Sequence, residues 1–150
     1  MTSPASKPCI FCKIIRGDEQ SYDVFADEVS LAFLDRRPLF PGHCLLVPKG
    51  HYETLDDLPL ALIAPLFTNA QLLARAVEQG LEAHGSLVAI NNHVSQSVPH
   101  LHIHIVPRRR KDGLKGFFWP RHPYQDQESI LQIQQALRST IARLQARRVT

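Results

Sequence analysis

Hydrophobic and polar residues alternate over several short stretches of the chain, and these stretches predict strands. Each stretch is rich in Val, Ile, Leu or Phe and is bounded by Gly, Pro, Asn or Asp. The stretch HCLLVP at 43–48 is apolar on both faces, so we expect it near the centre of a sheet. The predicted strands lie at 21–26, 29–35, 43–48, 87–91 and 101–107.

Two longer stretches repeat apolar residues every three or four positions, which predicts amphipathic helices. The first spans 58–82, where Pro59 and Pro65 disturb the first turns, and the second spans 127–147. A short helical turn also follows Cys9 and ends at Gly17. The apolar positions are Leu62, Leu66, Ala70, Leu73, Val77 and Leu81 in the first long helix, and Ile130, Ile133, Leu137, Ile141 and Leu144 in the second.

The last predicted strand belongs to the stretch QSVPHLHIHIVP at 96–107, in which every second residue is a histidine: His100, His102 and His104. In an extended chain these imidazoles would share one face at intervals of about 6.5 to 7 Å, while the aliphatic residues between them enter the core. One alternative is a strand whose histidine face simply lies in solvent. We do not favour it because histidine is uncommon on the solvent face of a strand. One imidazole would attack a phosphate while its neighbours bind a metal or the leaving group. A catalytic His-x-His metal pair is the alternative.

Composition and charge narrow the class of protein. The 150 residues are 44% hydrophobic and 21% charged, as in an ordinary globular domain, and we see no apolar run long enough to cross a bilayer. Residues 1–8 lack the apolar core of a secretory signal, so we expect a cytoplasmic protein with no membrane partner. A net charge of +3 is too small to indicate nucleic acid, which we regard as an improbable partner.

The three cysteines do not form the even set of a disulfide framework. Cys9 and Cys12 form a Cys-x-x-Cys pair that can give two thiolates to one zinc, which then lacks two ligands. His51, directly after the third strand, and His100 would complete a closed structural site. A redox or chance pair is the alternative, although no strand precedes the motif as in a thioredoxin-like unit. We assign Cys44 to packing.

In order and spacing, these residues resemble the histidine triad family, defined by His-φ-His-φ-His-φ-φ with φ hydrophobic. Residues 100–106 match this motif at every position. The resemblance covers roughly 9–110 and includes further motifs, namely CIFCKII at 9–15, LAFLD at 31–35, PGH at 41–43, LVPK at 46–49 and Gln96-Ser97.

The resemblance implies an α+β fold, the histidine triad fold, with a five-stranded antiparallel sheet and a long helix, usually in a homodimer. To this the sequence adds the predicted C-terminal helix. We therefore expect a flexible arm at 1–8, a HIT domain at 9–110, and a C-terminal extension with its helix at 111–150 that is part of the same domain.

The resemblance also implies a reaction and a metal. The middle histidine of the triad, here His102, attacks the α-phosphorus of a nucleotide, and water then hydrolyses the nucleotidyl-histidine. In metal-containing members a structural zinc is held by residues that match Cys9, Cys12, His51 and His100.

Chemistry independently supports these roles. His102 is a competent nucleophile if a backbone carbonyl accepts a hydrogen bond from its other nitrogen. His104 can donate to the phosphate or the leaving oxygen, with Gln96 and Ser97 as neutral donors. His43 resembles a family histidine that helps to hold the triad.

The remaining predicted positions concern substrate binding. By resemblance, Asp35 accepts hydrogen bonds from the ribose hydroxyls, or is an ordinary residue at a strand end. Asn91 is placed near the phosphates. The apolar base cleft is assigned to Phe33, Leu34 and Ile14. Trp119 either stacks on a second base or packs at the dimer.

We therefore predict a zinc-containing hydrolase of nucleotides linked through the α-phosphate. His104 favours hydrolases over the transferase branches, which place glutamine there, and Arg36-Arg37-Pro38 before Pro-Gly-His resembles the branch that cleaves dinucleoside polyphosphates. Hydrolysis of adenosine phosphoramidates of the AMP-lysine type is the alternative. A binding module with vestigial catalysis and a nucleic-acid end-processing protein are rivals, the latter suggested by the basic run 108–111, which we interpret as a solvated rim.

Overall fold

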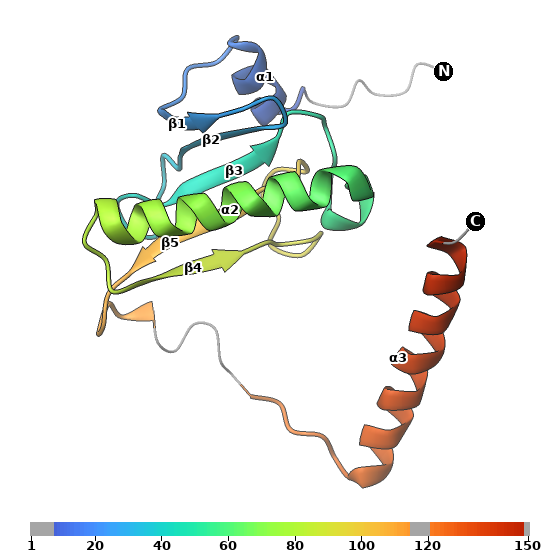
Figure 1. Cartoon of the computed structure of the whole chain (residues 1–150). Coiled ribbons are helices and arrows are strands. Elements are labelled where there is room, and N and C mark those ends of the chain that lie inside the picture. The colour runs from blue at the N-terminus through green and yellow to red at the C-terminus, as the bar shows by residue number, and fades with distance from the viewer. Residues whose placement is uncertain (1–7, 115–120, 149–150) are drawn as a thin grey trace. The chain divides into compact units, whose positions relative to one another are not determined.

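The computed structural model describes residues 8–114 and 121–148. The arm predicted at 1–8, except for Pro8, and Trp119 therefore lie outside the described residues. In chain order the elements are α1 (Ile10–Arg16), β1 (Asp23–Ala26), β2 (Ser30–Leu34), β3 (Cys44–Pro48), the short 3-10 helix η1 (Leu55–Asp57), α2 (Leu60–Gly80), β4 (Gly85–Ala89), β5 (Ile103–Arg108) and α3 (Gln127–Arg148) (Figure 1).

The five strands form one antiparallel sheet in the order β1-β2-β3-β5-β4. This confirms the predicted α+β fold, with β3 at the centre. Leu45 of β3 pairs with His104 of β5, and paired residues share a face of a sheet. The central strand therefore lies directly beside the histidine segment.

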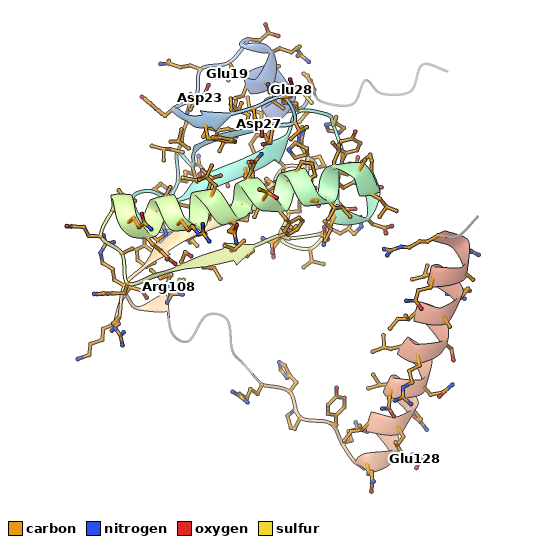
Figure 2. The ribbon with its side chains drawn as sticks, in the orientation of Figure 1. Glu19, Asp23, Asp27, Glu28, Arg108 and Glu128 are labelled. Carbon is orange, nitrogen blue, oxygen red and sulfur yellow. The ribbon has the colours of Figure 1, made fainter. Side chains whose placement is uncertain are left out.

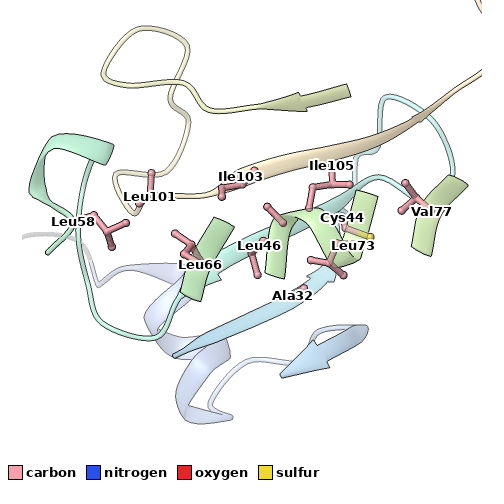
Figure 3. Close-up of a cluster of buried hydrophobic side chains, with 11 residues drawn as sticks. Ala32, Cys44, Leu46, Leu58, Leu66, Leu73, Val77, Leu101, Ile103 and Ile105 are labelled. Atoms are coloured by element: carbon pink, nitrogen blue, oxygen red, sulfur yellow. The ribbon is translucent and has the colours of Figure 1, made fainter. Parts of the chain in front are cut away.

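Helix α2 covers one face of this sheet (Figure 1). Its buried side chains recur at helical spacing and pack with β2, β3 and β5 residues in one core (Figure 3): Leu66, Ala70, Leu73 and Val77 from the helix, and Ala32, Leu46, Ile103 and Ile105 from the strands. Burial of such side chains is the main stabilising contribution to the fold. The apolar face predicted for this helix is therefore used as a core face.

Helix α2 is apolar over much of its length. By length and composition this helix could cross a membrane, because its most apolar 18-residue window has a mean hydropathy of 1.4. It contains no uninterrupted apolar run of that length, because polar residues, among them Asn69, Arg75 and Glu78, are spaced along it. The buried residues Leu66, Ala70, Leu73 and Val77 pack in the core, so part of its apolar surface covers the sheet.

The other face of the sheet carries a second, smaller core. Phe11 of α1 packs there with Leu31, Phe33, Leu45 and Val47. Helix α1 is capped at both ends, since the Cys9 side chain accepts from the backbone of Cys12, and Gly17 adopts a left-handed conformation with φ of 83°. Glycine suits that C-terminal position because it has no Cβ to clash. His104, which shares its face with Leu45, points to this side.

The histidine segment is only partly a strand. Strand β5 begins at Ile103, so His100 and His102 precede the paired region, contrary to the prediction of one strand at 101–107. The reason lies in the backbone acceptors: the carbonyl of Pro48 accepts from the ring of His100, and the carbonyl of His100 accepts from the ring of His102. Imidazoles thus take hydrogen bonds that strand partners would otherwise make.

The chain divides into two units, 1–112 and 113–150. The second contains α3, which confirms the helix predicted at 127–147. Asp126 begins this helix by accepting a hydrogen bond from the backbone of Ser129 at 2.7 Å. That the extension forms one domain with residues 9–110 stays a prediction.

Candidate active site and metal site

The four predicted metal ligands converge. The Nδ1 atom of His100 lies 3.4 Å from the Sγ atom of Cys9 and 3.2 Å from the Nδ1 atom of His51. The Sγ atom of Cys12 lies 3.3 Å from His51 Nδ1 and 3.6 Å from His100 Nδ1. Residues from α1, from the end of β3 and from the segment before β5 therefore meet at one point.

These separations fit a tetrahedral zinc ion. With Zn–N and Zn–S bonds of about 2.0 and 2.3 Å, ligand atoms are about 3.4 Å apart for two nitrogens and about 3.6 Å apart for nitrogen and sulfur. The ring of His100 donates from Nε2 to the Pro48 carbonyl at 2.9 Å, which leaves the Nδ1 lone pair facing the other three ligands. The four residues form a closed donor set.

Burial matters to this cluster. His100 is fully buried, and burial lowers the pKa of its imidazole, which favours the neutral form that binds metal. Burial and the neighbouring Cys9 raise the pKa of the Cys12 thiol. A cation that replaces the thiol protons would stabilise the thiolates in this environment.

His102 has the geometry of a free nucleophile. Its Nδ1 donates to the His100 carbonyl at 2.7 Å, so the lone pair of a neutral ring lies on Nε2. Its side chain is only 4% exposed, and its ring centroid is 4.9 Å from that of His104. The sequence anticipated the need for a carbonyl partner, and the residue two positions earlier supplies it.

A second chain of hydrogen bonds fixes His104. The backbone N–H of Leu39 donates to Nδ1 of His43 at 3.1 Å, so the neutral His43 ring carries its proton on Nε2. That nitrogen lies 2.9 Å from Nδ1 of His104 and donates to it. His104 therefore carries its own proton on Nε2, where it can donate to a substrate.

The electrostatic environment keeps these rings neutral. Burial lowers the pKa of His104 to about 4, with a further contribution from His102 and His43. Burial likewise lowers the pKa of His43, while Asp35 opposes this shift. A carboxylate oxygen of Asp35 lies 3.8 Å from His43 Nε2. These three residues are also close enough to hold a metal, but the hydrogen bond between the rings already uses their facing nitrogens.

A cavity of about 170 Å³ lies between α1 and the end of β2. Four residues that the sequence analysis assigned to base and ribose binding line it: Ile14, Phe33, Leu34 and Asp35. One oxygen of Asp35 accepts from the backbone of Arg37 at 2.8 Å. This hydrogen bond fixes the carboxylate at the edge of the cavity.

The other three residues predicted to contact substrate do not line this cavity. The amide of Gln96 accepts from the backbone of His93 and donates to the Glu53 carbonyl, so it holds the loop before the triad. Ser97 lines a separate opening of about 680 Å³ beside the metal ligands. Asn91 is half-buried in the segment that follows β4.

The sequence did not identify several cavity residues, notably Phe11 and the rim formed by 19–21. The sequence could have placed Phe11 near the site. It lies between Cys9 and Cys12, and a metal bound by these cysteines and by His100 would hold this motif close to the triad. The rim residues carry no such signal.

The basic run 108–111 was expected as a solvated rim of the site. Arg108 instead forms a two-bond ion pair with Asp112, and Arg109 donates to the Leu81 carbonyl at the end of α2. Figure 2 places Arg108 far from Glu19, which lines the cavity. Arg108 and Arg109 thus support the local structure.

The fold and site define a small α+β protein in which alternating histidines follow a cluster of two cysteines and His51, and in which a separate cavity is lined by α1 and the end of β2. The family model of the HIT domain matches residues 16–111. The chain belongs to the histidine triad family, as the sequence predicted.

Three known proteins illustrate the relationship. The chain is 35% identical over 115 residues to adenylylsulfatase HINT3 of Arabidopsis thaliana, covering 75% of this chain but only 58% of that protein. It is 36% identical over 117 residues to adenosine 5'-monophosphoramidase HNT1 of Saccharomyces cerevisiae, covering 76% and 73%. A zinc-bound histidine triad family protein of Mycobacterium smegmatis has a similar structure, with a TM-score of 0.68, 37% identity and coverage of 93% and 96%.

Proposed function

We propose that this chain hydrolyses adenine or guanine nucleotides linked through the α-phosphate, with a nucleotidyl-histidine intermediate on His102. The observation that carries the proposal is the free Nε2 lone pair of His102, set by the hydrogen bond from Nδ1 to the His100 carbonyl at 2.7 Å. The donor Nε2–H of His104 and the Asp35 cavity supply leaving-group and ribose contacts.

Relatives named adenylylsulfatase and adenosine 5'-monophosphoramidase bear out the prediction of a HIT-family nucleotide hydrolase. Those names describe adenylates with different leaving groups on the α-phosphorus. This common feature supports adenine nucleotides as the substrate class.

The proposed reaction has two steps. His102 Nε2 attacks the α-phosphorus, so that a phosphorus–nitrogen bond forms while the bond to the leaving group breaks. His104 donates a hydrogen bond to the leaving atom, where negative charge develops, and the leaving group takes up a proton from solvent as it departs. Water then attacks the phosphorus, the phosphorus–nitrogen bond breaks, and the nucleoside monophosphate is released.

Among leaving groups we place amines first, as in an adenosine phosphoramidate, and polyphosphates second. The yeast relative's name supports this order. One of the two arginines that favoured dinucleoside polyphosphates is engaged, since Arg36 donates to the Gln20 carbonyl. A polyphosphate chain would have to compete with this partner.

A structural zinc is part of the proposal, with Cys9, Cys12, His51 and His100 as ligands. The zinc-bound relative from Mycobacterium smegmatis and the fit of the ligand distances support it. The ion would supply no step of the reaction. Bound by these four residues, it would fix the backbone of His100, whose carbonyl orients His102. Elemental analysis should find about one zinc per chain, whereas a redox pair would hold none.

We also propose a cytoplasmic homodimer. The free cysteines Cys9, Cys12 and Cys44 suit a reducing compartment. The outermost strand β4 offers an unpaired edge, with Val88 45% exposed, where a second copy could pair. Light scattering should give twice the chain mass of 17.0 kDa.

Purified protein should be offered adenosine phosphoramidate and diadenosine polyphosphate, with release of adenosine monophosphate or adenosine polyphosphate followed by chromatography. We expect faster turnover of the phosphoramidate, and none of either substrate by the His102→Ala variant. Cleavage of neither substrate by the parent protein would overturn the hydrolase proposal in favour of a binding module.

A further inference from the structure

Phe11 lies between the two proposed sites. It occupies a position inside the Cys-x-x-Cys motif of α1, and its side chain is 6% exposed. Its ring is 5.8 Å from that of His100 and 5.2 Å from that of His102, at interplanar angles of 74° and 83°. One aromatic side chain thus packs edge-on against both a metal ligand and the nucleophile.

Phe11 also forms part of the nucleotide cavity. It lines this cavity together with Ile10 and Ile14 of the same helix. Its ring also packs against that of Phe33, another residue that lines the cavity, with 5.4 Å between the ring centroids. A displacement of α1 would therefore move one whole wall of the cavity.

Helix α1 depends on external contacts for its position. It has seven residues, and isolated helices of this length are unstable in water. Two of the metal ligands, Cys9 and Cys12, belong to its first turn or its cap, whereas His51 and His100 belong to the sheet side. Metal bound by these four residues would join the cavity wall to the sheet.

We propose that Phe11 is a positioning residue that couples the metal site to the nucleotide cavity, so that metal occupancy raises nucleotide affinity. This rests on the proposed function, because it concerns the same cavity. Coupling between binding sites is reciprocal, so the nucleotide also raises the affinity for metal. Coupled sites commonly change one another's affinity by about 5- to 150-fold, and we expect about tenfold here.

The test uses full-length protein, zinc-loaded or freed of metal by a chelator, with adenosine monophosphate as the probe. Calorimetry should give a Kd about ten times higher for the metal-free form. Competition with a metal-binding dye should show zinc held more tightly by a similar factor when adenosine monophosphate is present.

A variant separates coupling from general damage. Phe11→Leu keeps an apolar side chain but removes the ring edges that face His100 and His102, while all four metal ligands remain. We expect it to bind one zinc, to bind adenosine monophosphate more weakly when loaded, and to lose most of the difference between loaded and metal-free forms. Phe67→Leu, at a 39% exposed position on α2, is the matched control and should behave as the parent.

Each outcome decides a different point. Equal Kd values with and without zinc, or a full zinc effect in Phe11→Leu, would overturn the coupling while leaving the proposed hydrolase intact. If metal removal unfolds the chain, the test depends on the zinc-loaded Phe11→Leu protein alone. A Kd for adenosine monophosphate equal to that of the zinc-loaded parent would reject the role of Phe11. If neither form binds adenosine monophosphate, the proposed function fails and the coupling fails with it.

Discussion

His100 and His102 lie two residues apart and both donate one ring hydrogen to a backbone carbonyl, yet they use opposite nitrogens. His100 donates from Nε2 to Pro48, which turns Nδ1 toward two cysteines and His51. His102 donates from Nδ1 to His100, which leaves Nε2 free. The comparison teaches that the position of the carbonyl acceptor, rather than the residue type, decides which ring nitrogen is left free in the proposed metal ligand and in the proposed nucleophile.

The largest expected effect removes the nucleophile. His102→Ala should lower kcat by a factor on the order of 10⁴ or more, since a covalent route loses its attacking atom. Zinc content should stay at that of the parent, because His102 is not a ligand. Steady-state rates combined with elemental analysis check both statements, and residual activity within tenfold of the parent would place the nucleophile elsewhere.

Removal of the other histidine should act on the fold first. His100→Ala should lose zinc and several kcal/mol of stability, because structural zinc binding contributes on the order of 10 kcal/mol in small sites. Thermal unfolding and zinc analysis measure this. A His100→Ala protein that retains one zinc and the parent Tm would contradict the ligand assignment.

A smaller effect should follow loss of His43. This residue fixes the position of the His104 proton and is not one of the proposed metal ligands. His43→Ala removes the donor to Nδ1 of His104, so the His104 proton is no longer held on Nε2. We expect kcat to fall by about 10²-fold, comparable with the lower range for a lost proton donor. The control is His84→Ala, which changes an exposed histidine. Equal rates for the two variants would show that His43 has no role in orienting His104.

The smallest effect concerns pH and stability. The pKa of His104 is about 4 in the folded protein against 6.5 ordinarily, so the unfolded chain binds this proton more readily. The contribution of neutral His104 is complete above pH 6.5 and is lost as pH falls toward 4. This single group adds a slope of at most about 1.4 kcal/mol per pH unit.

Urea unfolding between pH 7 and 4.5, on the parent and on His104→Gln, isolates that contribution. The parent should lose free energy of unfolding more steeply than the variant as pH falls. Parallel pH profiles would show that His104 is not held neutral by its environment.

The sequence predicted all five strands and both long helices, because each carries its own apolar period. It also predicted which cavity residues meet, since Phe33, Leu34 and Asp35 follow one another along β2 and its end. The start of β5 was missed because the ring hydrogen bonds of His100 and His102 replace strand pairing there.

Long-range placement explains the remaining differences. The link between His43 and His104 depends on the register in which Leu45 pairs with His104, which no local pattern reveals. Gln96 was expected to add a neutral donor at the phosphate, and no local pattern indicated that its amide donates to the carbonyl of Glu53, a residue 43 positions earlier. The partners of Arg108 and Arg109 likewise emerge only in three dimensions.

The central claim is that His102 bonds covalently to phosphorus through Nε2. A phosphorus–nitrogen bond is cleaved in acid, so the reaction should be quenched in base within one turnover. The protein is then analysed by intact-mass and peptide mass spectrometry. The account predicts a mass increase of one nucleotidyl group confined to the peptide that contains His102, and no increase in His102→Ala. A nucleotidyl group on another residue, or the same adduct in the variant, would contradict it.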